Sequence, residues 1–249
     1  MADAAAATPS CSSTPSYTLV VGQKRYNSWG ARPWILMRAL SIPFQEQTLQ
    51  IEGIGPNPRL QAVSPSSLIP LLTHGELKVW DSLAIAEYLY ERHPAVWPAA
   101  PAARALARCI AAEMHSGFAD VRAALSFNLG YRLAAPHALE GKVAAQVARI
   151  AALWRAAREA HGAGGPYLFG AAFTAADAMY APVALRFHTY RVTLACAVAE
   201  AYAAALRAHP AVAEWAALAL SAAEGEAPIA HYDAHLVALG GVKQERYEP

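Results

Sequence analysis

The sequence predicts two domains, a small α/β domain followed by an all-α domain. Alanine, the strongest helix former, occurs 13 times in residues 1–100 but 47 times in the other 149 residues. In the first hundred residues, short β-type runs alternate with helical patterns. Three prolines interrupt the segment in which the composition changes. We therefore expect the α/β domain at residues 17–93, a linker at 94–101 and the helical domain at 102–239.

The first domain should contain a small mixed sheet with helices on both faces. Its elements follow the order βαβ and then αββα, which suits that arrangement. The β-type runs occupy residues 17–21, 44–49, 71–73 and 77–80, and the helical patterns occupy residues 32–40, 58–63 and 82–92.

Two apolar stripes with helical spacing open the second domain. They run over residues 106–125 and 143–157, and we interpret both as core faces. Residues 174–177, Thr-Ala-Ala-Asp, resemble a capping box with Asp in place of Glu, and a helix should run from there to about residue 190. Two shorter helices should follow, separated by the His-Pro pair at 209–210.

Both ends of the chain are expected to be loose. Residues 1–16 are rich in Ala, Ser, Thr and Pro, lack Arg and contain no leucine-type apolar segment. They predict a disordered tail rather than a signal or transit peptide. Residues 240–249 are polar and predict a flexible tail.

Charge and hydropathy exclude several classes of protein. The 20 basic residues nearly cancel the 19 acidic ones, so the charge balance does not favour a nucleic-acid or anionic-membrane partner. Mean hydropathy is +0.19, yet no stretch holds about 18 uncharged, strongly apolar residues, as a membrane-spanning helix requires. Three widely spaced cysteines without a CxxC pair predict neither a disulfide framework nor a metal site. We expect a soluble, cytoplasmic protein without nucleic-acid, membrane or metal partners.

A polar segment lies between the first strand and the first helix. Pro33 suits an early helical position, so Ser28 should lie just before or at the helix N-terminus. One interpretation makes Ser28 an ordinary N-cap. The other uses the unpaired N–H groups and the dipole of the helix to stabilise an anion.

A second segment places a proline directly before a short apolar strand. Pro70 is permitted there, because it stands at a strand start. If the Ile69–Pro70 bond is cis, the backbone N–H and C=O of Ile69 could face a ligand and pair with an extended peptide.

A third segment, Asp81 and Ser82, separates a strand from an amphipathic helix. Either residue could be a mere helix cap. Alternatively, Ser82 and the helix N-terminus bind a carboxylate while Asp81 binds an ammonium group. Together they would recognise the head group of an amino acid.

These segments, in this order, resemble the cytosolic glutathione S-transferase superfamily. The similarity covers roughly residues 17–225 and depends most on the Ile69–Pro70 turn, the run Asp-Ser-Leu-Ala-Ile-Ala-Glu-Tyr-Leu from Asp81, and the box at 174–177. The Ser-Trp pair ahead of Arg-Pro-Trp is similar to serine-type members, of the zeta class or related bacterial classes. The resemblance implies a thioredoxin-like glutathione-binding domain, a helical substrate domain, glutathione as cosubstrate and a homodimer.

The resemblance also implies roles for individual residues. Ser28 becomes the catalytic hydroxyl that hydrogen-bonds the glutathione sulfur. Ile69 becomes the backbone partner of the cysteinyl unit, and Asp81 with Ser82 becomes the γ-glutamyl site.

The identity of the activating residue has alternatives. Counting back without gaps from the following helix selects Asn27, whereas counting from the arginine four residues on selects Ser28. Asn27 can also donate a hydrogen bond. Tyr26 is a third and weaker candidate, because tyrosine-type classes use a residue near the end of the first strand.

The expected reaction is detoxification by conjugation, in which the glutathione thiolate attacks a small hydrophobic electrophile. The candidate substrate pocket contains Trp29, Met114, His115, Phe118 and Arg186. Helix core is the favoured interpretation for Met114 and Phe118.

Two other functions are compatible with the same family. A cis–trans isomerase of maleylacetoacetate type needs a cation for the substrate carboxylates. Thr189 stands where zeta members carry an arginine, and Arg186 lies one turn earlier on the same face. A non-catalytic binding module is the other alternative, and the presence of Ser28 together with the Asp81–Ser82 pair argues against it.

Overall fold

Four strands form a mixed sheet in the order β2-β1-β3-β4. The computed structural model describes residues 16–51, 57–221 and 228–249. The mixed sheet predicted from the sequence is confirmed. β1 (Tyr17–Gly22) pairs in parallel with β2 (Phe44–Leu49) and antiparallel with β3 (Leu71–His74), which pairs antiparallel with β4 (Leu77–Val79).

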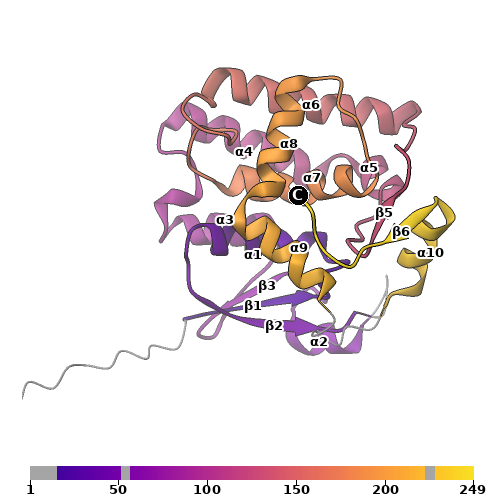
Figure 1. Cartoon of the computed structure of the whole chain (residues 1–249). Coiled ribbons are helices and arrows are strands. Elements are labelled where there is room, and N and C mark those ends of the chain that lie inside the picture. Colours follow the sequence, from indigo (N-terminus) through magenta and orange to yellow (C-terminus); the bar gives the residue numbers. More distant parts are fainter. Residues whose placement is uncertain (1–15, 52–56, 222–227) are drawn as a thin grey trace, which may run out of the picture.

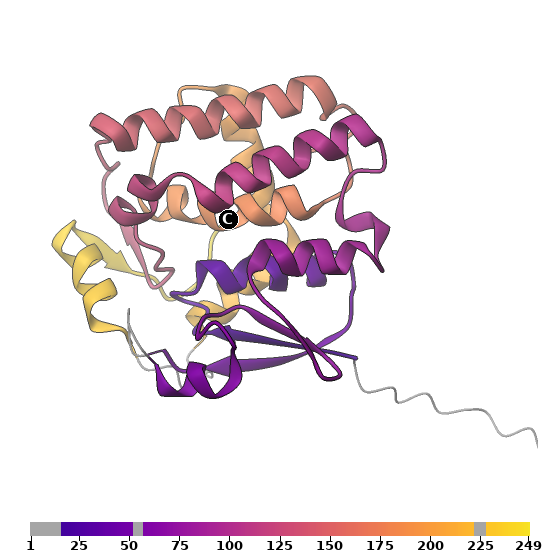
Figure 2. The same ribbon diagram turned by 180° about the vertical axis from the view of Figure 1, so that it is seen from behind.

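Helices cover both faces of this sheet (Figure 1). α1 (Ser28–Ala39) and α3 (Ser82–Tyr90) lie on the face toward the helical domain, and α2 (Pro58–Val63) lies on the opposite face. Figure 2 shows from behind that the helical domain sits against the same layer of α1 and α3. α1 begins at Ser28 rather than at residue 32, because the side chain of Asn27 accepts a hydrogen bond from the third N–H that follows it.

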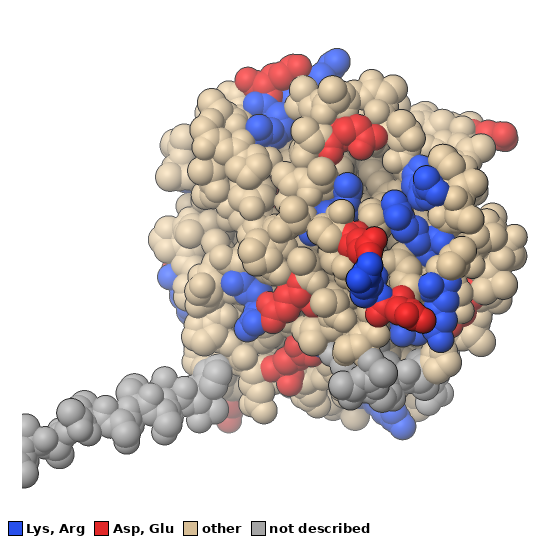
Figure 3. Space-filling view, viewed as in Figure 1, with Lys and Arg blue, Asp and Glu red and all other residues tan. Residues whose placement is uncertain are grey.

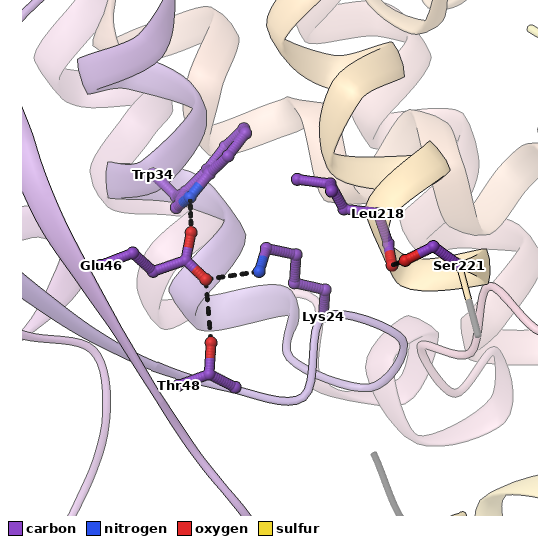
Figure 4. A network of polar contacts seen from close by, with 6 residues as sticks. All are labelled: Lys24, Trp34, Glu46, Thr48, Leu218 and Ser221. Carbon is purple, nitrogen blue, oxygen red and sulfur yellow. Dashed lines mark hydrogen bonds and ion pairs between the residues drawn. The ribbon is translucent and has the colours of Figure 1, made fainter. Parts of the chain in front are cut away.

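A partly buried ion pair connects the sheet to α1 (Figure 4). Lys24 Nζ, in the turn after β1, lies 2.5 Å from Glu46 Oε1 of β2. Glu46 also accepts hydrogen bonds from Trp34 Nε1 of α1 at 2.6 Å and from Thr48 Oγ1 at 2.8 Å. Burial acts to raise the pKa of Glu46, but these hydrogen bonds outweigh it and lower the pKa. The ionised carboxylate therefore joins β2 to the helix that begins at Ser28.

The helical domain is built around α7 (Ala175–Thr189). Every residue of α7 except His188 is buried, as expected for a helix that is packed on all sides. It contacts α1 of the first domain, as well as α4 (Pro101–Ser116) and α8 (Ala197–Ala208). The other helices of this domain are α5 (Ala119–Ala124), α6 (Gly141–His161), α9 (Pro210–Leu220) and α10 (Ala230–Ala238).

The predicted capping box at the start of α7 is confirmed. Asp177 is fully buried, and its carboxylate accepts hydrogen bonds from the backbone N–H groups of Leu168 and Thr174 at 3.0 and 2.9 Å. The hydroxyls of Thr174 and Tyr202 donate to it as well, each at 3.0 Å. Burial raises the pKa of Asp177, and the four donors oppose that shift. The carboxylate thus joins the loop before α7 to α8.

Two short strands interrupt the helical domain. β5 (Tyr131–Leu133) pairs antiparallel with β6 (Gly241–Lys243). The expectation of a flexible tail at residues 240–249 is therefore wrong for this part of the chain. The tail is held further along as well, because the Tyr247 hydroxyl donates to the Arg207 carbonyl at 3.4 Å.

The first apolar stripe, at residues 106–125, is divided between two helices. α4 ends at Ser116 and α5 begins at Ala119, because Phe118 between them has a left-handed φ of 58°. The apolar side chains of the stripe on both sides of this break remain buried, except for Leu106, which is partly buried. The expected linker contains a short 3₁₀ helix, η1 (Pro94–Val96).

No helix among the described residues is both long and apolar enough to span a membrane. The tail predicted at residues 1–16 lies, apart from Ser16, outside the part of the chain that the structure describes.

Candidate active site at the N-termini of α1 and α3

The N-terminus of α1 uses Asn27 and Ser28 for different purposes. Asn27 Oδ1 accepts a hydrogen bond from the Gly30 N–H and is the helix cap. Ser28, the first helical residue, therefore has a hydroxyl that is not used as a cap. The interpretation of Ser28 as an ordinary N-cap is wrong for this reason.

Ser28 contacts two buried arginines. Arg186 Nη2 of α7 donates to Ser28 Oγ at 3.0 Å, and Arg32 Nη1 of α1 donates to the Ser28 carbonyl at 2.9 Å. Ser28 is 5% exposed. Because its oxygen accepts from Arg186, the hydroxyl hydrogen of Ser28 is left to donate to another acceptor.

The electrostatics around Ser28 favour an anion. Burial lowers the pKa of Arg32 to about 9, and the charges of Arg186 and Arg122 act in the same direction. Burial also lowers the pKa of Arg186 to about 10, again with a contribution from Arg122. The carboxylate of Asp81 has the opposite effect and acts to raise the pKa of Arg32. An anion placed among these guanidinium groups would relieve their mutual repulsion.

The N-terminus of α3 presents Asp81 and Ser82. Asp81 Oδ1 caps the helix, accepting from the N–H groups of Leu83 and Ala84 at 3.0 and 3.4 Å. Asp81 Oδ2 lies 2.8 Å from His115 Nε2 of α4. Ser82 is 2% exposed, and its hydroxyl oxygen has no hydrogen-bond partner among the residues that the structure describes. A buried polar group without a partner is unusual, and it fits a hydroxyl that a ligand completes.

Trp29 connects the two helix N-termini. Its ring lies beneath the guanidinium of Arg32 at 4.1 Å and near that of Arg122 at 5.6 Å. The Trp29 and His115 rings contact each other edge to face, with their centroids 5.4 Å apart. His115 Nε2 in turn contacts the Asp81 carboxylate. The predicted residues Trp29, His115 and Asp81 therefore form one continuous set of contacts.

Ile69 also lies close to the start of α1. The Ile69–Pro70 bond is cis. A Cβ added to Gly22, at the end of β1, would lie 2.9 Å from Ile69 Cδ1 and 2.7 Å from Asn27 Nδ2. The absence of a side chain at Gly22 therefore lets the Ile69 turn and the N-terminus of α1 approach one another.

Other predicted residues lie elsewhere. Met114 and Phe118 are buried members of the hydrophobic core, in agreement with the favoured interpretation. The Tyr26 hydroxyl donates to Asp233 Oδ1 of α10 at 2.9 Å, and its ring stacks on Tyr232. Tyr26 is thus directed to α10 rather than left free at the end of the strand.

Two arginines of the site were not predicted from the sequence. Arg32 and Arg122 lie in helical patterns, where an arginine most often faces solvent. A signal for Arg32 exists in hindsight, because it is flanked by apolar residues from Trp29 to Met37 that are largely buried. Among the described residues, no group of three or more His, Cys, Asp or Glu side chains is placed to hold a metal ion.

The geometry agrees with two matches to protein families. The model for the glutathione S-transferase N-terminal domain matches residues 28–92, and the model for the C-terminal domain matches residues 136–217. Together they span more than half of the chain. The protein therefore belongs to the glutathione S-transferase superfamily.

Solved structures support the same fold. A theta class glutathione S-transferase from Xanthomonas axonopodis pv. citri with glutathione bound is 24% identical, with a TM-score of 0.59 over 82% of this chain and 98% of its own. The tau class enzyme from mango, Mangifera indica, is 18% identical, with a TM-score of 0.65 over 91% and 100%. A glutathione transferase homologue from Burkholderia with bound glutathione is 22% identical, with a TM-score of 0.57 over 80% and 95%. No protein of curated function matches the sequence.

Proposed function

We propose that this protein is a serine-type glutathione transferase, which activates the glutathione thiolate for attack on small hydrophobic electrophiles. The observation that carries the proposal is the hydrogen bond from Arg186 Nη2 to Ser28 Oγ at the N-terminus of α1. It orients the Ser28 hydroxyl so that its hydrogen is available to a sulfur acceptor.

Activation means favouring the thiolate over the thiol. A free cysteine thiol has a pKa of about 8.5, so most of it is protonated at pH 7. Lowering that pKa by about two units requires roughly 2.7 kcal/mol of preferential stabilisation. The Ser28 hydroxyl, the α1 N-terminus and the charge of Arg186 each act in that direction. Glutathione supplies the sulfur that forms the new C–S bond as the leaving group departs, and its thiol proton passes to water.

The rest of the glutathione molecule has matching positions. The Ser82 hydroxyl and the N-terminus of α3 suit the γ-glutamyl carboxylate. The exposed Asp81 carboxylate suits the ammonium group, although it must then share Oδ2 with His115. The backbone of Ile69 suits the cysteinyl unit.

The contacts of Arg186 also bear on the alternatives. Besides Ser28, Arg186 donates to the Leu125 carbonyl at 2.6 Å, and it is buried. These contacts support a role for Arg186 in orienting Ser28 more than a role in binding the carboxylates of a substrate. We therefore prefer conjugation to isomerisation of maleylacetoacetate type, and an enzyme to a non-catalytic binding module.

A role in detoxification and a cytoplasmic location complete the proposal. Cys109 and Cys196 are both free thiols, which suits a reducing compartment.

The reaction can be tested with two kinds of acceptor. With a chlorodinitrobenzene-type electrophile, we expect thioether formation and equal loss of glutathione. With a maleyl-type dicarboxylate, we expect little isomerisation. Isomerisation without net loss of glutathione would reverse this ranking, and tight glutathione binding without turnover of any electrophile would favour a binding module.

Ser28→Ala should act on the pH dependence of the reaction. Loss of the hydroxyl bond should raise the apparent pKa in the kcat/KM profile by about one unit or more, since one unit corresponds to about 1.36 kcal/mol of thiolate preference. Activity should therefore fall most below that pKa and recover at higher pH. Asn27→Ala is the control, because it removes the α1 cap, at about 0.5–2 kcal/mol of stability, without touching the hydroxyl. A shifted profile for Asn27→Ala with an unchanged one for Ser28→Ala would move the activating role to Asn27.

Ser82→Ala should weaken glutathione binding without affecting the fold. The Ser82 hydroxyl has no partner in the described part of the protein, so its removal leaves no donor or acceptor unpaired. KM for glutathione should rise about tenfold or more, as for a lost hydrogen bond to a charged group, with a smaller change in kcat. Asp81→Ala should raise KM too, but it also removes the α3 cap. Ser116→Ala, on α4, is the matched control, and a wild-type KM for Ser82→Ala would refute the γ-glutamyl assignment.

We also propose that the protein is a homodimer. Three large apolar side chains around β3 and β4 are exposed, namely Leu68 at 67%, Leu77 at 49% and Trp80 at 44%. Exposed apolar side chains of this size suit burial against a second subunit. Sedimentation should give a particle near twice the monomer mass of 26.5 kDa. A concentration-independent particle at the monomer mass would contradict the proposal.

A further inference from the structure

A second group of arginines surrounds a cavity that is not part of the site described above. The cavity has a volume of about 210 Å³ and lies between β5, the end of α7, the following loop and α8. Arg132, Arg191, Arg207 and His188 line it, together with one carboxylate, Glu200. Figure 3 shows several Lys and Arg groups gathered on this side of the molecule, over β5 and β6.

Two of these arginines have Nε groups without an acceptor in the described part of the protein. The Nε atoms of Arg132 and Arg207 are buried and have no hydrogen-bond partner among the residues that the structure describes. Neither guanidinium forms an ion pair with a described residue, whereas several other arginines of the protein pair with carboxylates at 2.7–3.3 Å. Because leaving a buried charged donor unpaired is costly, an acceptor supplied by a ligand would be strongly bound.

The charge of the cavity is unbalanced. Burial and the adjacent Arg132 and Arg207 lower the pKa of His188 to about 4, so the imidazole is neutral at pH 7. Burial lowers the pKa of Arg207 as well. Tyr247 and Glu200 act to raise this pKa, while Arg132 acts in the same direction as burial. Glu200 is already engaged, since its Oε1 accepts from the Leu194 N–H at 2.5 Å. Three guanidinium groups against one carboxylate leave about two positive charges, which matches a phosphate dianion better than a single carboxylate.

We propose that the cavity lined by Arg132, Arg191 and Arg207 is a binding site for a phosphate group. Guanidinium groups bind phosphate oxygens through paired N–H donors, and the unpartnered Nε atoms of Arg132 and Arg207 provide such donors. The neutral His188 ring is available for one further hydrogen bond to the same group.

The size of the cavity limits the ligand. Its volume is below the range of about 300–1,000 Å³ that is typical of sites for drug-sized molecules. It therefore accommodates a free phosphate ion or the phosphate end of a larger molecule. Arg132 and His188 also line a larger open groove of about 630 Å³ beside β6, where the rest of a larger molecule could lie.

Thermal unfolding and calorimetric titration with inorganic phosphate test this site directly. At constant ionic strength, phosphate at tenfold excess over its Kd should raise the Tm by about 3–6 °C relative to chloride. The R132Q/R207Q double variant should lose this shift and bind phosphate at least tenfold more weakly. R155Q is the matched control, because Arg155 lies on α6 with only a distant ion pair to Glu159 at 3.9 Å, and it should behave like the wild type.

The outcomes separate cleanly. An equal phosphate effect on the wild type and the double variant, or no effect on the wild type, would overturn the proposal. If the double variant does not fold, R191Q replaces it, since Arg191 is an exposed residue on the same wall, and binding should again weaken several-fold. Tighter binding of glycerol phosphate than of inorganic phosphate would identify a phosphomonoester as the ligand, and the reverse order would identify the free ion. None of these measurements requires glutathione or catalytic activity.

Discussion

Two buried arginines that reach across the domain boundary in opposite directions determine the geometry of the candidate active site. Arg32 of α1 donates to the Met179 carbonyl of α7 at 3.2 Å, while Arg186 of α7 donates to Ser28 Oγ of α1. Burying two like charges side by side costs free energy, and the cost is tolerable because backbone carbonyls and one hydroxyl accept from them. Ser28 is consequently held by both domains.

This arrangement makes the start of α1 strongly electropositive. The helix dipole, Arg32 and Arg186 all favour negative charge at the same place, and Arg122 adds to the potential from α5. The balancing carboxylate, Asp81, belongs to the neighbouring helix α3 and is held through His115 and Trp29. The two helix N-termini therefore form one electrostatic unit, in which a thiolate at one end and an amino-acid head group at the other are compatible.

Local patterns predicted most of the fold, because strands and helices of the first domain are bounded by turn residues and caps that lie close in sequence. The capping box at Thr174–Asp177 is the clearest example. By contrast, β5 and β6 pair across more than a hundred residues and are three residues long, so neither carries a period that sequence analysis can detect. The roles of Asn27 and Ser28 depend on which side chain reaches Gly30 and which reaches Arg186, and the latter contact spans 158 positions. Sequence spacing places both residues at the start of the first helix, but it cannot decide which of them caps the helix and which keeps a free hydroxyl or amide for a ligand.

The two arginine clusters lie on different sides of one helix. Arg186 and His188 are two positions apart on α7, which corresponds to a rotation of about 200° around the helix axis. Arg186 accordingly faces Ser28 and α1, whereas His188 faces Arg132 and Arg207. The first cluster is satisfied by the protein itself, and the second has guanidinium Nε groups without acceptors among the described residues. Any effect of an anion in the second cluster on the Ser28 site would have to pass through α7, whose buried faces contact both domains.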